Sequence, residues 1–122
     1  MNTVKKGYAA EKWFRDWFFE LGYMVDFKPR VKFNTIDIFG VWDFIARNKE
    51  QQIMVQVKSN MTHVSKAKTD IRRFANMFPP LISEQYFIMY KSGNVMRYWK
   101  YIRSVGIDTW REVTIKDLNS LI

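Results

Sequence analysis

Apolar and polar residues alternate with a period of two in the middle of the chain. Residues 41–47 (VWDFIAR) and 52–58 (QIMVQVK) each place every second side chain on one face, which predicts two β-strands. The polar residues 48–51 between them predict a hairpin turn. We expect the rest of the chain to be organised around this hairpin.

Two other segments show the helical period. Apolar side chains recur every three or four positions in residues 4–21, and Gly22 is placed to end that helix. Phe19 lies opposite the apolar stripe, which predicts an exposed ring. Residues 66–78 form the second predicted helix, with Ser65 as its expected N-cap.

The remaining pattern completes an α/β chain. Strands are predicted at residues 23–28, 85–90 and 95–102, and a short helix at residues 114–122. The predicted order is helix, three strands, helix, two strands and short helix. This order predicts a central mixed β-sheet flanked by helices.

Composition narrows the class of protein. A chain of 122 residues with 48% hydrophobic residues predicts a single domain over residues 1–122. No apolar run reaches the ~18 residues of a membrane span, and no apolar leader segment follows Lys5 and Lys6. With no cysteine in the chain, we expect a cytoplasmic protein. The net charge of +8 indicates a polyanionic partner.

Polar residues on the predicted hairpin indicate a site. Asp43 interrupts an apolar row, and Gln56 and Lys58 share a face of the next strand. A carboxylate and an amide oxygen suit Mg²⁺ or Mn²⁺, while a lysine can hold the attacking water and offset phosphate charge. These residue types fit metal-assisted phosphodiester hydrolysis. The alternative is a half-buried hairpin in which Asp43 pairs with an arginine and Lys58 extends to solvent.

Two further acidic residues each allow two interpretations. Glu11 lies at the border of the first helix's stripe and either reaches the site or favours the helix dipole. Asp37 would share a face with Asp43 if the strand between them were unbroken. It is either a second metal ligand or simply a turn residue. Gly40 between them is typical of a bulge. The single histidine, His63, is interpreted as a solvated loop residue.

Basic side chains cluster in sequence around these elements. We expect them to contact the phosphate backbone. The predicted DNA contacts are Lys5, Lys6, Lys28, Arg30, Lys32, Lys66, Lys68, Arg72 and Arg73. Basic and aromatic residues also alternate in residues 95–102, which fits either nucleic-acid contact or a strand with one wet face.

Taken together, these motifs resemble a known family. The order of helix, strands with Asp and then Gln-x-Lys, helix and strand is similar to the restriction-endonuclease-like PD-(D/E)XK nuclease superfamily. The start of the chain, KKGYAAEKWFRDWFFELGYMV, resembles the archaeal Holliday junction resolvases, as do VWDFIA, VQVKS and RYWKYIR. These patches span roughly residues 5 to 103 of the sequence.

The resemblance implies a restriction-endonuclease-like core and roles for single residues. Glu11 matches the family's first-helix glutamate, Asp43 its metal-binding aspartate and Lys58 its catalytic lysine. Gln56 stands where the family usually has glutamate, so one negative charge is missing from the metal site. The segment 28–40 is also longer than in the resolvases.

The sequence is therefore consistent with three functions. The first is a Mg²⁺-dependent DNA endonuclease, selective for branched DNA such as four-way junctions in recombination or repair. The second is a DNA-binding protein with the nuclease fold and an inactive site. The third is a basic interaction domain without nucleic-acid chemistry. Paired cleavage calls for two copies, so we expect a homodimer, with Phe19, Met77, Phe78 and Pro79 as interface candidates.

Overall fold

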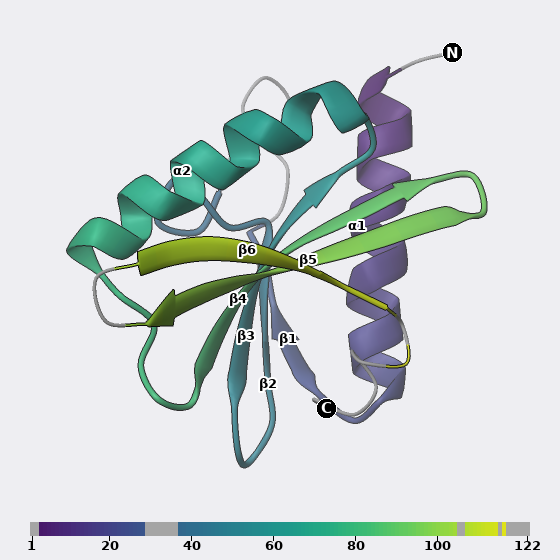
Figure 1. Cartoon of the computed structure of the whole chain (residues 1–122). Helices are drawn as coiled ribbons and strands as arrows, with labels where there is room; N and C mark the ends of the chain where they lie inside the picture. Colours follow the sequence, from purple (N-terminus) through teal and green to yellow (C-terminus); the bar gives the residue numbers. More distant parts are fainter. Residues whose placement is uncertain (1–2, 29–36, 105–106, 115, 117–122) are drawn as a thin grey trace.

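The chain folds around one six-stranded sheet with an α-helix on each face (Figure 1). The structure is a computed structural model, and it describes residues 3–28, 37–104, 107–114 and 116. In chain order the elements are α1 (Thr3–Glu20), β1 (Met24–Asp26), β2 (Phe44–Arg47), β3 (Gln52–Lys58), the 3₁₀ helix η1 (Met61–His63), α2 (Val64–Met77), β4 (Glu84–Ser92), β5 (Val95–Ser104) and β6 (Ile107–Val113). None of the described helices is long and apolar enough to cross a membrane.

The strands lie in the sheet in the order in which they occur in the chain, β1 to β6. Strands β3 and β4 are parallel, and every other neighbouring pair is antiparallel. The parallel pair is joined by η1 and α2, because parallel neighbours need a crossover connection. The prediction of an α/β chain with a mixed sheet is therefore confirmed.

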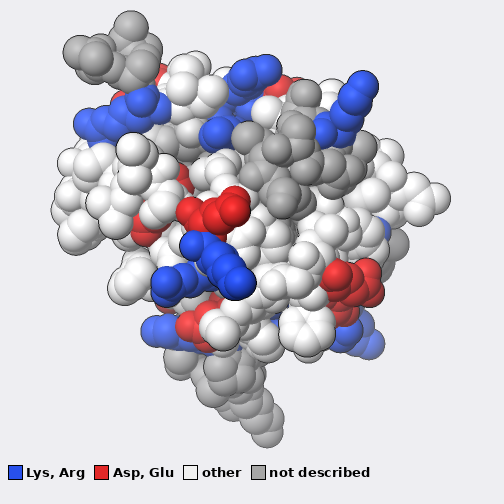
Figure 2. Space-filling view, turned by 90° about the horizontal axis from the view of Figure 1, so that it is seen from below, with Lys and Arg blue, Asp and Glu red and all other residues white. Residues whose placement is uncertain are grey.

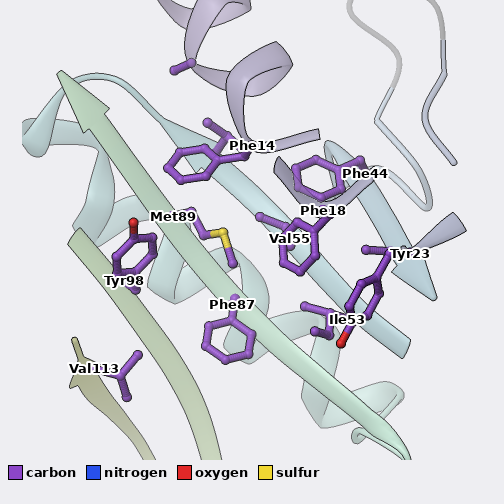
Figure 3. Packing of buried hydrophobic residues seen from close by; sticks show 13 residues of the cluster. Phe14, Phe18, Tyr23, Phe44, Ile53, Val55, Phe87, Met89, Tyr98 and Val113 are labelled. Atoms are coloured by element: carbon purple, nitrogen blue, oxygen red, sulfur yellow. The ribbon is translucent and has the colours of Figure 1, made fainter. Parts of the chain in front are cut away.

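Alternating side chains of the sheet give it two apolar faces. The first face packs under α1, where Phe14 and Phe18 lie against Val55 of β3 and Phe87 and Met89 of β4 (Figure 3). All of these side chains except Met89 are aromatic or β-branched, which suits a pleated surface. This packing fixes the position of α1, and with it the position of Glu11.

The second face packs under α2. Ala67 and Ile71 of the helix share one buried cluster with Met54 of β3, Ile88 of β4 and Trp99 of β5. Because β3 contributes alternate residues to the two faces, Ile53, Val55 and Val57 point to α1 while Met54 points to α2. The predicted alternation of β3 is confirmed, and its bounds are those predicted.

One turn interrupts the segment expected to be a continuous strand. β2 begins at Phe44, and residues 38–42 form a separate turn closed by the bridge between Ile38 and Trp42. Phe39 and Gly40 both have positive φ, which is incompatible with an extended strand. The strand predicted at residues 41–47 therefore begins three residues later, at Phe44, and the unbroken strand that would put Asp37 and Asp43 on one face is not formed.

Other boundaries also differ from the prediction. Ser65 is not the N-cap of α2: the helix starts at Val64, and His63 precedes it without a side-chain cap bond. Asn60 instead caps η1 by accepting a hydrogen bond from the Thr62 backbone N–H. The edge strand β6 was not predicted. The predicted helix at residues 114–122 lies mostly outside the described residues, as does the basic loop that holds Arg30 and Lys32.

Candidate active site

A cavity of about 240 Å³ lies at the C-terminal end of the inner strand β3, next to the first turns of α1. It is the place where the sequence-predicted carboxylates meet. Its lining consists of Gly7, Glu11, Asp37, Asp43, Val57, Lys58, Ser59 and His63. Four of the predicted site residues (Glu11, Asp37, Asp43 and Lys58) are thus brought together from three separate parts of the chain.

Asp43 is held at the floor of this cavity by the backbone of β3. Its Oδ2 accepts a 2.6 Å hydrogen bond from the Val57 N–H, and its own N–H donates to the Val55 carbonyl at 2.9 Å. Burial, together with the negative charges of Glu11 and Asp37, raises the pKa of Asp43 to about 7. The Val57 hydrogen bond and the charge of Lys58 lower this pKa but do not offset the burial.

A carboxyl group with such a pKa is poised for a cation. At neutral pH it exchanges its proton readily, and a divalent cation beside it would favour the ionised form. Perturbed carboxylates of this kind concentrate at functional sites, although ion-pair networks also produce them. In this cavity the raised pKa coincides with a second acid and a lysine, which is the grouping expected of a metal site.

Glu11 is buried on the wall of the same cavity and has an ion-pair partner that the sequence analysis did not consider. Arg15, one helical turn later, places its Nε 3.3 Å from Oε2 of Glu11, and both side chains are less than 10% exposed. The guanidinium of Arg15 lies 3.7 Å from the ring centroid of Phe27. Arg15 therefore fixes the position of Glu11 and offsets its charge.

Gln56 is buried beside the cavity and does not line it. Its Nε2 donates a 2.9 Å hydrogen bond to the Val41 carbonyl, so its amide is held in one orientation. Its Oε1 is buried and has no hydrogen-bond partner among the described residues. A buried amide oxygen without a donor carries a free-energy cost, and a bound cation would remove that cost.

Asp37 and Lys58 both line the cavity and come from different elements. Asp37 stands just before the turn at residues 38–42, and Lys58 is the last residue of β3. The broken strand therefore does not separate the two acids, because the turn brings Asp37 back to the cavity that Asp43 lines. Ser59 and His63 complete the wall on the side of η1.

The donor set fits a hard divalent cation held in part by its substrate. Among the described residues, no three acidic or histidine side chains are close enough to form a metal site by themselves. Mg²⁺ does not require such a set, since it binds through one or two carboxylates and fills its octahedron with water and phosphate oxygens. Asp43, with Asp37 or Glu11, supplies ligands of this type from the cavity lining, whereas the Gln56 oxygen lies beside that lining.

The predicted DNA-contact residues differ in their accessibility. Lys5, Lys28, Lys66, Arg72 and Arg73 are exposed, Lys6 and Lys68 are half-buried, and Arg30 and Lys32 lie outside the described residues. Lys68 lies 5.4 Å from the ring centroid of Trp99, which accounts for its partial burial. At the end of the molecule that carries the β2–β3 turn, acidic and basic side chains are interspersed (Figure 2). The described residues at that end form a surface of mixed charge.

Sequence reasoning missed Arg15, Ser59 and His63 as members of the site. The spacing of Glu11 and Arg15, four residues apart on a helix, was a signal for their ion pair. His63 was interpreted as a solvated loop residue; it is exposed, yet it also lines the cavity. No family model and no curated protein matches the chain. The chemistry of the site is therefore inferred from its geometry.

Proposed function

We propose that the chain is a metal-dependent DNA endonuclease that hydrolyses phosphodiester bonds at the cavity around Asp43. The observation that carries this proposal is the half-buried Asp43 carboxyl, whose pKa is raised to about 7 in a cavity shared with Glu11, Asp37 and Lys58. A structural carboxylate is normally paired so that its pKa falls, whereas this carboxyl is arranged to accept a cation.

Each residue has a role in this proposal. A bound Mg²⁺ or Mn²⁺ would activate water for attack and neutralise charge that develops on the phosphate. Asp43, whose Oδ2 is held by the Val57 N–H, would bind the cation through its other carboxylate oxygen. Lys58 places a positive charge where the phosphate and the attacking water meet. Glu11, fixed by Arg15, stands as a second acceptor for the water or the cation.

The order of elements supports membership of the PD-(D/E)XK nuclease superfamily as a proposal. The described chain runs α1, β1, β2, β3, α2, β4, with Asp43 just before β2 and with Gln56 and Lys58 in β3. This order agrees with what the resemblance to the Holliday junction resolvases implies. Within the proposal, the substrate is branched DNA and the role is in recombination or repair.

Exposed apolar side chains support a homodimer as part of the same proposal. Phe19 is 72% exposed on α1, and Met77 and Phe78 are more than half exposed at the end of α2. Two active sites related by a two-fold axis would cut two strands at related positions. Sedimentation at micromolar concentration, with and without DNA, tests this part: a monomer in both conditions would contradict it.

A second candidate is DNA binding without cleavage. Gln56 removes a charge that the family's glutamate would supply, and the Arg15 guanidinium offsets the charge of Glu11. Both features lower the affinity for a cation. Under this candidate the net charge of +8 still attracts DNA, but no divalent cation is retained.

One experiment separates the candidates. The protein is incubated with end-labelled four-way-junction, flap and plain duplex DNA in Mg²⁺, in Mn²⁺ and in EDTA. We expect cleavage of branched DNA in either metal and none in EDTA. Binding of DNA without cleavage in either metal would favour the second candidate, and an absence of binding would contradict both.

A further inference from the structure

The turn that carries Asp37 to the cavity also holds a phenylalanine in an unfavourable backbone conformation. The Val41 N–H donates to the Ile38 carbonyl at 3.2 Å and closes the turn around Phe39 and Gly40. Phe39 has φ 55° and Gly40 has φ 73°, the signs found in type I′ turns. Such turns favour Asn-Gly or Gly-Gly, and a bulky residue at positive φ is an outlier.

Burial of the Phe39 ring does not offset this backbone strain. It is 71% exposed, and its main contact is a stacked arrangement with Phe74 of α2, with ring centroids 6.3 Å apart. The ring borders an apolar hollow of about 740 Å³, which Met77, Phe78 and Leu81 also line. A residue that is both strained and exposed contributes little to the stability of the fold.

The base of the turn, in contrast, is firmly anchored. Ile38 and Trp42 are buried, and their backbones exchange hydrogen bonds of 2.8 and 3.0 Å. Trp42 is followed directly by Asp43, and Asp37 precedes Ile38. The turn therefore links Asp37, which lines the candidate active site, to Phe39, which borders the apolar hollow.

We infer that Phe39 stacks on an unpaired base of the DNA whose backbone lies in the Asp43 cavity. This inference rests on the proposed function and adds to it the way in which branched DNA is recognised. Aromatic rings stack on bases of any sequence, and apolar side chains can also enter opened base steps. In an intact duplex the bases already stack on each other, so the ring gains a partner only where pairing is interrupted.

Two observations favour a nucleobase over a protein as the occupant. The ring belongs to the turn that directly follows Asp37, a residue that lines the Asp43 cavity, so Phe39 is close in the chain to the place where a phosphate would bind. The chain also carries a net charge of +8, which selects a polyanion over a neutral apolar partner. The stacked Phe74 ring extends the aromatic surface that a base would meet.

The turn geometry supplies a variant that we expect to keep the turn intact. Phe39→Asn creates the Asn-Gly pair that this turn type prefers, so it should relieve strain while it removes the ring. Phe39→Trp keeps an aromatic surface. Met24→Ala is the matched control, because Met24 is 75% exposed and lies on the edge strand β1.

The test compares affinities by fluorescence anisotropy for a plain duplex and for the same duplex with a single-stranded flap, in an Asp43→Asn background that does not cut. We expect Phe39→Asn to weaken flap binding about 10-fold or more and duplex binding by less than about 2-fold. Phe39→Trp and Met24→Ala should leave both affinities unchanged.

Three results would overturn the inference in distinguishable ways. If Phe39→Asn changes neither affinity while the parent binds DNA, Phe39 is not a base contact, and the proposed function stands. If it weakens both DNAs equally and converts a dimer into a monomer by sedimentation, the ring belongs to a protein interface. If the parent binds neither DNA, this inference and the proposed function fail together.

Discussion

The backbone N–H of Val57 donates a 2.6 Å hydrogen bond to Oδ2 of Asp43, and it ties the start of β2 to the end of β3. The bond fixes the carboxyl in one orientation inside the candidate active site. Backbone donors of this kind do not move when a ligand binds, so the geometry for a cation is prepared in advance.

Stability should depend on pH through Asp43. The pKa of Asp43 is about 7 in the folded protein and roughly 3.9 in the unfolded chain. Between these two pH values the folded protein keeps a proton on Asp43 that the unfolded chain has released. The free energy of unfolding therefore falls as pH rises through this window, by up to about 1.4 kcal/mol per pH unit from this group.

Asp43→Asn should remove this dependence and leave a protein at least as stable at pH 7. Chemical denaturation at several pH values between about 4 and 8 measures it, with the exposed Asp26→Asn as the control. Unfolding of Asp43→Asn at pH 7 would show that the carboxyl is needed for the fold and not for chemistry.

Gln56→Glu should increase the response to metal. The new carboxylate lies beside Asp43 and cannot donate to the Val41 carbonyl, so without metal the variant should be less stable than the parent. Mg²⁺ or Mn²⁺ should restore that stability and bind about 10-fold more tightly, equivalent to about 1.4 kcal/mol. Thermal unfolding across a metal titration measures both effects.

The control is Gln56→Met, which lacks the amide oxygen and should lose the stabilisation by metal. Equal stabilisation of Gln56→Glu and Gln56→Met by metal would place this side chain away from the cation.

Glu11 and Arg15 should be energetically coupled. Both side chains are buried, and their closest charged atoms are 3.3 Å apart. Arg15→Met alone should be more destabilising than Arg15→Met combined with Glu11→Gln, because the single change leaves a buried acid without its cation. Denaturation of the two single variants and the double variant gives the coupling, which we expect to be about 1–3 kcal/mol. Additive effects would show that the pair does not position Glu11.

The exposed face of α2 should contact phosphates. The slope of log K for DNA binding against log salt concentration should become less steep by up to about 1.8 when Arg72→Ala is combined with Arg73→Ala. Each neutralised phosphate contributes about 0.9 to this slope. The control removes the same charge at the β2–β3 connection, as Arg47→Ala at the end of β2 with Lys49→Ala in the turn. If the two pairs change the slope equally, the effect is net charge and not a docking surface.

Much of the fold follows from the alternation along β3. Its apolar residues point to two buried faces, so its bounds are recoverable from the sequence. Strand β6 (IDTWREV) is an edge strand, and most of its residues that can be assigned are not buried; its pattern therefore lacks the apolar signal of an inner strand.

The candidate site was recoverable only in part. Residue types and spacing identified Asp43 and Lys58, because chemistry requires those side chains. The role of Arg15 depends on Phe27, which reaches it only through the folded connection between α1 and β1. Gly40 indicated an irregularity between Asp37 and Asp43, but the positive φ of Phe39 was hidden, because phenylalanine is a strand-favouring residue and its conformation is imposed by the anchored turn.

Single-turnover cleavage of a four-way junction by the parent protein and by Asp43→Asn, with protein in excess so that all DNA is bound, tests the role of Asp43 directly. We expect Mg²⁺-dependent cleavage by the parent, a rate at least about 100-fold lower for Asp43→Asn, and equal junction affinity for both. Cleavage by Asp43→Asn at the parent's rate would contradict the claim that Asp43 holds the catalytic cation.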